Sequence, residues 1–261
     1  MFSETALARE DSLALARRAV VFAPIGGQGL VEQAVRRLGE AIGLGLLELG
    51  ERLPPEAELA ERLDLSVMTV RQALAILREA GYLETRRGRG GGTFVRRAVP
   101  PPPLRKARQR LASLTAEDLQ DLTDFRLAVA GAAAALAAQR ATQAELEALR
   151  ALVETMAAPP RYSEFRRADS RFHLAIASAS RSTRLAASEA SIQSEIGELM
   201  SLIPHPAEAL RVSNAQHRAI LEAVSRRDPD AARALTEEHV RGTGDFLVGL
   251  RLGKVETCAS R

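Results

Sequence analysis

The sequence predicts a mainly α-helical protein of two domains, with one small β-hairpin. Apolar residues recur at three- and four-residue spacing through most of the chain, whereas a strand-like pattern is confined to about residues 82–95. Four consecutive prolines, Pro100–Pro103, divide the chain, since such a run forms a stiff, extended linker. With 261 residues, of which 46% are hydrophobic, the chain is long enough to bury two cores.

The first expected domain covers residues 29–97 and follows an N-terminal arm, residues 1–28, that has little pattern. Three helices are predicted in this domain because runs of helical periodicity are separated by glycine, proline and aspartate. Ser66 is placed to cap the third helix, since its hydroxyl can accept a hydrogen bond from an amide of the first turn. The expected helices cover about residues 30–43, 54–63 and 67–80.

Two short strands, 82–85 and 93–95, are predicted on either side of a turn rich in arginine and glycine. Residues 86–110 contain nine basic residues and no acidic one. Such a run is often only a solvated surface, but its place beside a glycine-rich turn favours a polyanion partner. Three helices followed by a basic hairpin are the plan of a winged helix-turn-helix, whose third helix enters the major groove of DNA. We therefore expect double-stranded DNA as a partner.

Four motifs run through this domain: Gly50-Glu51-Arg52-Leu53-Pro54, Glu58-Leu59-Ala60, Thr69-Val70-Arg71-Gln72-Ala73-Leu74, and Arg87-Gly88-Arg89-Gly90 followed by Gly92-Thr93-Phe94-Val95. In this order and spacing they resemble the DNA-binding domain of the GntR family of transcription regulators. The resemblance implies operator contacts from one end of the third helix and from the wing. The implied residues are Ser66, Thr69, Arg71, Arg86, Arg87, Gly88, Arg89 and Gly90.

Several positions depart from the family pattern. Pro55 stands where a capping serine is usual, and Met68 replaces a common threonine. Ala57 and Val67 stand where many members carry arginines that contact bases or phosphates. We therefore expect more reliance on Arg71 and the wing, and the operator sequence stays open.

The second expected domain, residues 114–252, is an all-α helical bundle, joined by a proline-rich linker, 98–113, and followed by a C-terminal tail, 253–261. Thr115 with Asp118, and Thr142 with Glu145, match capping boxes that open two helices. Asp228-Pro229 is expected to cap and begin the last helix. The other expected helices cover about residues 162–178, 183–202 and 207–226.

Three of the four histidines and one aspartate lie on apolar faces of these helices. Asp169 and His173 are four residues apart and share a face, whereas His217 and His239 lie on two later helices. A lone histidine in such a place is commonly a hydrogen-bonded core residue, and that alternative stays open. Convergence on a divalent cation would satisfy all four side chains, which are costly to bury unpaired. His205, between two prolines, is expected to be a bystander.

The same segments carry a second resemblance: Asp169-Ser170-Arg171-Phe172-His173, Gln216 to Val224, Asp228 to Ala232, and Glu238-His239-Val240. They are similar to the FCD domain, the effector-binding helical bundle of the FadR-like GntR group. The resemblance implies that Asp169, His173, His217 and His239 bind a divalent metal ion, with zinc favoured and nickel, iron or manganese as alternatives.

Arg126 matches a family arginine directed into the effector pocket, where its guanidinium could bind the carboxylate of a small organic acid. An interhelical salt bridge is the alternative role. Ala130 and Ser182 depart from the glutamate and asparagine that are common in the family, so the effector pocket is expected to differ in size or polarity.

These observations favour a ligand-responsive transcription regulator, a repressor by the commoner family mode, that binds an inverted-repeat operator as a homodimer. The alternative is a metal-dependent hydrolase with an appended nucleic-acid-binding domain, but the sequence offers no convincing general base beside the histidines. A third hypothesis is a constitutive DNA-binding protein whose helical domain only dimerises. We expect no enzyme activity.

The sequence also indicates the cellular compartment of the protein. The longest apolar run, Leu127–Ala138, is too short to span a membrane, so no membrane partner is expected. Pro24, Gly26 and Gly27 interrupt the only stretch that resembles a secretory signal. A single cysteine, Cys258, excludes an internal disulfide framework. The sequence therefore predicts a cytoplasmic protein.

Overall fold

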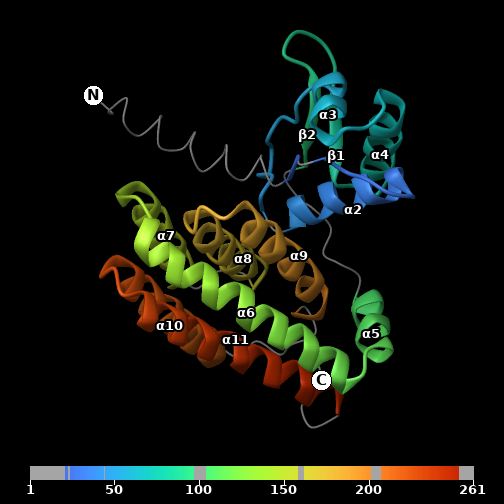
Figure 1. The fold of residues 1–261 in the computed structure, drawn as a ribbon. Helices are drawn as coiled ribbons and strands as arrows, with labels where there is room; N and C mark the ends of the chain where they lie inside the picture. Colours follow the sequence, from blue (N-terminus) through green and yellow to red (C-terminus); the bar gives the residue numbers. More distant parts are fainter. Residues whose placement is uncertain are drawn as a thin grey trace. The chain divides into compact units, whose positions relative to one another are not determined.

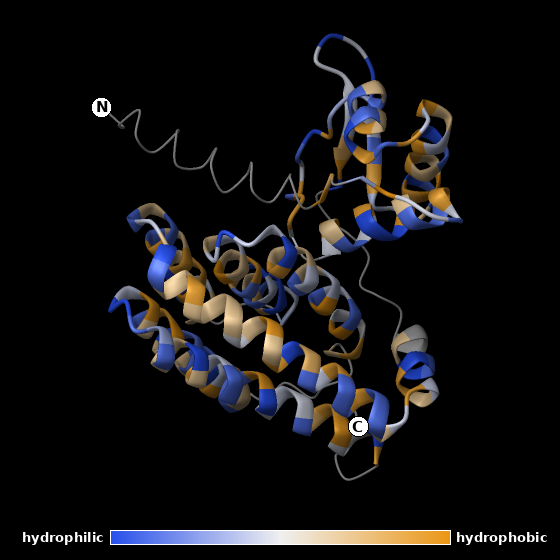
Figure 2. Ribbon diagram, in the orientation of Figure 1, coloured by the Kyte–Doolittle hydropathy of each residue, from blue (hydrophilic) through white to orange (hydrophobic). Residues whose placement is uncertain are grey.

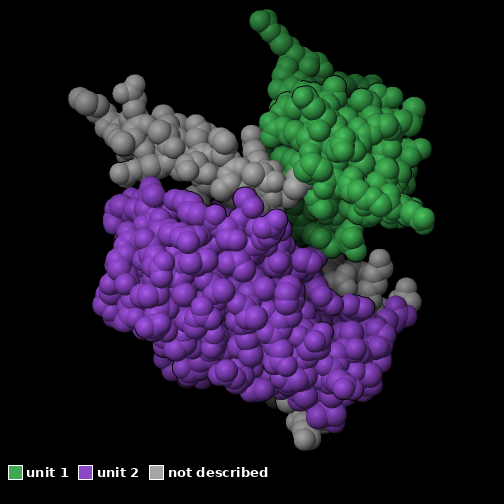
Figure 3. All heavy atoms as spheres, viewed as in Figure 1, with its two compact units in different colours: residues 1–101 green, residues 102–261 purple. Residues whose placement is uncertain are grey.

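The computed structural model describes residues 21–22, 24–43, 45–96, 104–157, 162–200 and 207–252. These ranges leave out the predicted C-terminal tail, the four prolines, His205 and the first 20 residues of the predicted N-terminal arm. The chain divides into two compact units, residues 1–101 and 102–261 (Figure 3). Each unit is described by itself.

The first unit is a winged helix-turn-helix, as the sequence predicts. Its hairpin is antiparallel and pairs Leu83 with Val95 and Arg86 with Gly92. Helix α4 packs against both α2 and α3, and strand β1 follows α4 (Figure 1). The elements are α2 (Leu30–Gly43), α3 (Glu56–Leu63), α4 (Val67–Glu79), β1 (Leu83–Arg86) and β2 (Gly92–Val95).

Local signals set the tight turn between α3 and α4. Asp64 ends α3 in the left-handed conformation, with φ of 54°, which aspartate tolerates better than most residues. Ser66 then caps α4, because its Oγ accepts a hydrogen bond from the amide of Thr69 at 3.0 Å. The three helices enclose a fully buried aliphatic core, so the direction of α4 is fixed by packing as well as by its cap. That core includes Leu38, Leu59, Leu63 and Leu74.

The second unit is a helical bundle, also as predicted. Helix α6 is central and contacts α8, α9, α10 and α11 (Figure 1). Figure 2 shows weakly hydrophobic residues along the middle of α6, where its alanines lie. The helices are α5 (Leu104–Ser113), α6 (Ala116–Arg140), α7 (Gln143–Ala157), α8 (Tyr162–Ala179), α9 (Thr183–Met200), α10 (Ala207–Ser225) and α11 (Pro229–Arg251).

The predicted caps of three helices are present. Thr115 and Asp118 form a complete capping box at the start of α6, with N–H···O distances of 2.7 and 3.0 Å. Thr142 and Glu145 exchange the equivalent bonds before α7, at 2.8 and 3.3 Å. Before α11, Asp228 Oδ1 accepts a hydrogen bond from the Ala231 amide at 3.0 Å. Each bond satisfies an amide that the first helical turn leaves without a partner.

Residues 104–113, which the sequence analysis places in the proline-rich linker, form helix α5. The segment that follows the prolines, Leu-Arg-Lys-Ala-Arg-Gln-Arg-Leu, consists of strong helix formers. Ala107 and Leu111 of α5 are buried in a cluster with Leu119, Leu199 and Leu247. The helix is therefore stabilised by packing on the bundle as well as by its own propensity.

Two glycines at the contact between α6 and α11 have different surroundings. A methyl group on Gly244 would lie 2.5 Å from Thr123 Oγ1 and 3.0 Å from Thr123 Cβ. Thr123 is buried, and its hydroxyl donates to the Leu119 carbonyl at 2.7 Å, so it has little freedom to move. A methyl group on Gly131 would instead meet Glu237 Oε1 at 2.6 Å, the end of a flexible side chain.

We expect Gly244→Ala to lower the free energy of unfolding by about 1–3 kcal/mol, because the overpacked helices must separate. Gly131→Ala is the matched control. Its overlap can be relieved by rotation of Glu237, and alanine is the better helix former by about 1 kcal/mol, so we expect a change near zero. Urea denaturation of the full chain, followed by circular dichroism, measures both variants. Equal losses of stability would contradict this account of the contact.

Within the described ranges, none of the helices combines the length and the apolar character needed to cross a lipid bilayer.

Candidate functional site

The start of α4 presents two of the residues that the sequence assigned to DNA contact. The hydroxyls of Ser66 and Thr69 lie 2.8 Å apart, and Ser66 Oγ also accepts a hydrogen bond from the Thr69 amide. Ser66 is exposed and Thr69 is half-buried. The two side chains therefore brace each other at the exposed end of the helix.

Arg71, one turn later, is exposed and forms an ion pair with Glu56 of α3, with Nε 2.9 Å from Oε2. Exposed pairs of this kind contribute at most about 1 kcal/mol. A phosphate or a guanine edge can therefore replace Glu56 as the partner of Arg71 at small cost.

The wing arginines occupy two different environments. Arg86 donates to Glu84 Oε1 at 2.6 Å, and its guanidinium lies 4.3 Å from the centre of the Phe94 ring. It is therefore held against the hairpin, at the last strand pair before the turn. Arg87 and Arg89 are exposed at the tip. Between them, Gly88 has a φ of 92°, a conformation that glycine adopts without strain. The tip can therefore present two exposed cations to a phosphate backbone.

Two apolar side chains are exposed beside these polar groups. Val67 and Met68, on the first turn of α4, are 40% and 59% exposed. Apolar side chains on a groove-facing turn can contact the methyl group of thymine. This end of α4 therefore offers hydroxyl, cationic and apolar groups to DNA.

The second unit contains a buried polar cluster formed by Asp169, His173, His217 and His239. These residues come from α8, α10 and α11, and all four are buried. One potential ligand atom from each lies within 4.8 Å of the others. That spacing is close to the roughly 4 Å between opposite ligands of a divalent ion with 2.0–2.2 Å bonds.

The cluster lacks the hydrogen bonds that a buried polar group needs. His173 Nε2 and both ring nitrogens of His217 have no hydrogen-bond partner. The nearest carboxylate oxygen, Asp169 Oδ1, lies 3.4 Å from His217 Nε2. Two residues outside the cluster contact its members: Gln216, whose Oε1 lies 3.0 Å from His239 Nδ1, and Arg166, which donates to Asp169. Buried nitrogens without partners are costly, so the residues fit a divalent cation better than they fit an ordinary core.

The protonation states favour metal ligation. Burial lowers the pKa of His217 to about 4, and it brings the pKa values of His173 and His239 well below 6.5. Burial alone would raise the pKa of Asp169. However, Arg166, which donates to Asp169 Oδ2 at 2.6 Å, and the three histidines hold that pKa well below its usual range. Near neutral pH the cluster therefore offers three neutral imidazoles and one carboxylate.

A second buried polar group adjoins this cluster. Arg126 of α6 and Glu189 and Gln193 of α9 are each at least 96% buried. Gln193 Nε2 donates to Glu189 Oε1 at 2.9 Å, but Arg126 Nε, Glu189 Oε2 and Gln193 Oε1 have no hydrogen-bond partner. Burial lowers the pKa of Arg126 and raises the pKa of Glu189. The opposite charges of the two groups partly offset both shifts.

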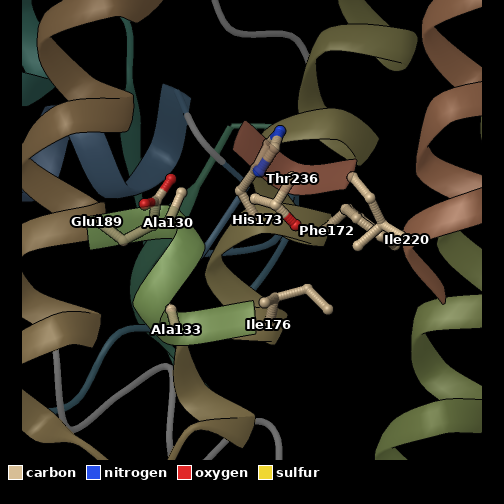
Figure 4. Close-up of a pocket in the computed structure, with 8 residues that line it drawn as sticks. All are labelled: Ala130, Ala133, Phe172, His173, Ile176, Glu189, Ile220 and Thr236. Atoms are coloured by element: carbon tan, nitrogen blue, oxygen red, sulfur yellow. The ribbon is translucent and has the colours of Figure 1, made fainter. Parts of the chain in front are cut away.

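A small cavity connects the two groups (Figure 4). Its wall includes His173 from the first group and Glu189 from the second, and most of its other residues are apolar. Arg126 lies one helical turn before Ala130, which lines the cavity. The lining residues are Ala130, Ala133, Phe172, His173, Ile176, Glu189, Ile220 and Thr236.

The structure thus brings together the four residues that the sequence proposed as metal ligands, and it buries Arg126 close to them. Sequence reasoning missed the residues that complete the site. Arg166 and Gln216 had a usable signal, because they lie three residues before Asp169 and directly before His217. Glu189 and Gln193 had none, since a glutamate and a glutamine four residues apart are ordinary on an exposed helix face.

Comparisons with known proteins match each of the two units to a known domain family. Residues 30–95 match the family described as bacterial regulatory proteins of the gntR family, and residues 121–242 match the FCD domain. A regulator from Mycobacterium gastri, the HTH-type transcriptional regulator RmpR, is 37% identical over 220 residues, which cover 84% of this chain and 80% of the relative. The L-lactate dehydrogenase operon regulatory protein of Escherichia coli is 33% identical over 222 residues, 81% of this chain and 83% of the relative.

Among solved structures, McbR/YncC of E. coli is similar over 86% of this chain and 99% of its own, with a TM-score of 0.51 and 24% identity. This likeness supports the fold alone. Together with the winged helix-turn-helix, the family matches define a transcription regulator that binds DNA. The chain belongs to the GntR family and carries an FCD domain after its DNA-binding domain. It is not an enzyme, and the hydrolase hypothesis has no support.

Proposed function

We propose that the chain is a ligand-responsive repressor that binds an inverted-repeat operator as a homodimer and is regulated by a small organic acid. The observation that carries the sensing part is the buried cluster of Asp169, His173, His217 and His239. In this cluster, His173 Nε2 and both ring nitrogens of His217 lack hydrogen-bond partners. A regulator that needed its helical unit only for dimerisation would gain nothing from these costly groups.

Asp169, His173, His217 and His239 are the residues that would hold a divalent ion, with zinc favoured for this nitrogen- and oxygen-donor set, and nickel, iron or manganese as alternatives. When bound, the ion would supply positive charge and open coordination positions for a carboxylate. Arg166 fixes the Asp169 carboxylate, and Gln216 orients the His239 ring. Such supporting contacts are what set the geometry of a metal site.

Arg126 is the proposed carboxylate partner on the protein side. Its buried guanidinium has an unused Nε–H, and its charge faces Glu189 and Asp169 at longer range. A carboxylate effector would satisfy that donor with a charge-assisted bond. The relative from E. coli that regulates the L-lactate dehydrogenase operon is named for an enzyme that acts on such an acid, which supports this effector class.

Two protomers related by a two-fold axis would place two α4 helices on successive major grooves, which predicts an inverted-repeat operator. Binding selection from random duplex DNA, followed by mobility-shift assays with and without small carboxylates, tests the proposal. We expect an inverted repeat and release of the DNA by at least one acid. Because the coupling is reciprocal, the releasing acid must bind more weakly to the DNA complex than to the free protein.

Arg71 is expected to contribute more to operator affinity than any other single residue of α4. Arg71→Ala should weaken operator binding by about 1–3 kcal/mol, the range for loss of one good arginine contact to a base. Glu56→Gln is the matched control, since it releases Arg71 without removing it and should leave binding unchanged or slightly tighter. Titrations at one fixed salt concentration measure both variants. An unchanged affinity of Arg71→Ala would remove Arg71 from the interface.

A further inference from the structure

A third extended segment, residues 50–53, pairs with the hairpin of the first unit. Two backbone hydrogen bonds of 2.9 Å join it to β2, one on each side of an antiparallel bridge between Arg52 and Phe94. In such a pair the two opposed residues exchange no hydrogen bond themselves, and their side chains come closest together. The sheet therefore fixes the backbone of Arg52 and places its side chain beside Phe94.

The two faces of this small sheet differ in character. Side chains alternate between the faces along each strand, and directly opposed residues share a face. One face is buried in the unit and carries Leu53, Leu83 and Val95, each at most 3% exposed. The outer face carries Arg52, Glu84, Arg86, Gly92 and Phe94. The outer face is therefore mostly charged, with one aromatic ring at its centre.

The side chain of Arg52 runs along β2 toward the turn of the hairpin. A methyl group on Gly92, two residues closer to the turn than Phe94, would lie 2.8 Å from Arg52 Nε and 3.5 Å from Arg52 Cζ. The guanidinium therefore lies over Gly92, where the sheet has no side chain. Arg86 is opposite Gly92 on β1, and its guanidinium lies over the Phe94 ring. Two arginine side chains thus occupy the part of the hairpin next to the turn.

Only one of these two arginines is neutralised by an acidic residue. Arg86 donates to Glu84 at 2.6 Å. Arg52 is exposed, and within the part of the chain that the structure describes its side chain has no ion pair or hydrogen bond. The outer face therefore keeps one unbalanced positive charge, next to the exposed Arg87 and Arg89 of the turn. Figure 1 shows this turn projecting beyond the helices of the unit.

We propose that Arg52 is a further DNA-contacting residue, which binds one backbone phosphate per protomer beside the wing. The chain belongs to a family of DNA-binding regulators, and the inference requires neither repression nor an effector. An arginine on the stem of the hairpin is placed to contact the sugar-phosphate strand while the tip approaches the groove. Its planar guanidinium can donate two charge-assisted hydrogen bonds to phosphate oxygens. Because the sheet already orders the backbone, only the side chain loses freedom on binding.

The competing explanation is that Arg52 only covers Gly92 and stabilises the hairpin. The two explanations differ in the salt dependence of DNA binding. Each phosphate that a protein neutralises releases condensed counterions, and it contributes about 0.9 to the slope of the logarithm of affinity against the logarithm of salt concentration. A residue that acts only through the shape of the wing changes the affinity without changing this slope.

Titration of the full chain with a short duplex of mixed sequence, followed by fluorescence anisotropy at about 50 to 200 mM salt, separates these explanations. Arg52→Gln removes the charge but keeps a polar side chain over Gly92. We expect its slope to be smaller by about 0.9 per bound protomer. Its loss of affinity should therefore shrink about three- to fourfold per bound protomer across this range. Arg52→Lys keeps the charge and should restore most of the slope.

Arg36→Gln is the matched control, because it removes an exposed arginine of α2 that pairs with Glu40 at 3.9 Å, and it should keep the parent slope. Urea denaturation of every variant checks the fold, and Arg52→Met replaces Arg52→Gln if the glutamine variant does not fold. An unchanged slope in the uncharged variant would overturn the inference, even if its affinity or stability fell.

Two other results would also overturn the inference. A reduced slope that Arg52→Lys does not restore would come from the shape of the wing rather than from its charge. A slope reduced equally by Arg36→Gln would show that the loss of any surface charge in this unit has the same effect. A reduced slope in Arg52→Gln alone, restored by Arg52→Lys, is the result that supports a phosphate contact.

Discussion

Replacement of His217 by alanine is expected to abolish metal binding. His217 is the most buried of the four cluster residues, at 0% exposure, and both of its ring nitrogens lack partners. Removal of one of four ligands leaves three donors, a weaker site that we expect to lose its ion during purification. Elemental analysis of protein purified without an affinity tag should find about one metal ion per chain in the parent and none in the variant.

His205→Ala is the matched control, because this histidine was expected to take no part in the site, and it should keep the parent metal content. Removal of the ion by a chelator should lower the thermal midpoint of the parent but not that of His217→Ala. An ion present at 1,000 times its dissociation constant stabilises the fold by about 4 kcal/mol, so the shift should be several degrees. Equal metal in the parent and His217→Ala would exclude the cluster as the binding site.

The metal-free chain is expected to lose stability as the pH falls from about 6.5 to 4. The pKa of His217 is near 6.5 when unfolded and about 4 when folded, so the unfolded chain takes up the proton first. Protonation therefore favours unfolding throughout this interval, by about 1.4 kcal/mol per pH unit and about 3 kcal/mol in total for His217 alone. His173 and His239 act in the same direction.

Asp169 acts in the same direction as the histidines, but in a lower pH range. Its folded pKa is lowered, so its carboxylate stabilises the fold above its unfolded pKa, near 3.9, and that stabilisation is lost only at lower pH. Urea denaturation of metal-free protein between pH 4.5 and 7 isolates the histidines. The slope of stability against pH should be shallower in His217→Ala by roughly 1 kcal/mol per unit. Identical slopes would show that His217 is not buried in its neutral form.

The helical elements were predictable because their signals are local. Caps such as Ser66, Thr115 and Asp228 act within one turn of their own helices, and the observed ends agree with the predicted ones to within about two residues. Helix α5 was not predicted as a separate element, because residues 98–113 were assigned to the proline-rich linker. Its burial depends on contacts with residues such as Leu199, far along the chain, which no local pattern reveals.

The candidate site was predictable only in part, for a similar reason. The metal cluster consists of rare residues, so three histidines on apolar faces stand out from the background. Glu189 stands on the same helix as the exposed Glu195, and it is buried because α9 packs against α6 and α8. The internal partners of Arg71 and Arg86 likewise depend on which acidic residue the fold brings near.

The site draws its groups from α6, α8, α9, α10 and α11, so its occupancy bears on how the bundle opens. A bound ligand must be released before any of these helices can unfold alone. When the site is occupied, we therefore expect the five helices to unfold together rather than one at a time. Hydrogen exchange would register this change as slower exchange in all five helices at once, with no effect on α2, α3 or α4. The bound ligand would then hold these five helices together. They would fluctuate as one unit when the site is occupied and separately when it is empty.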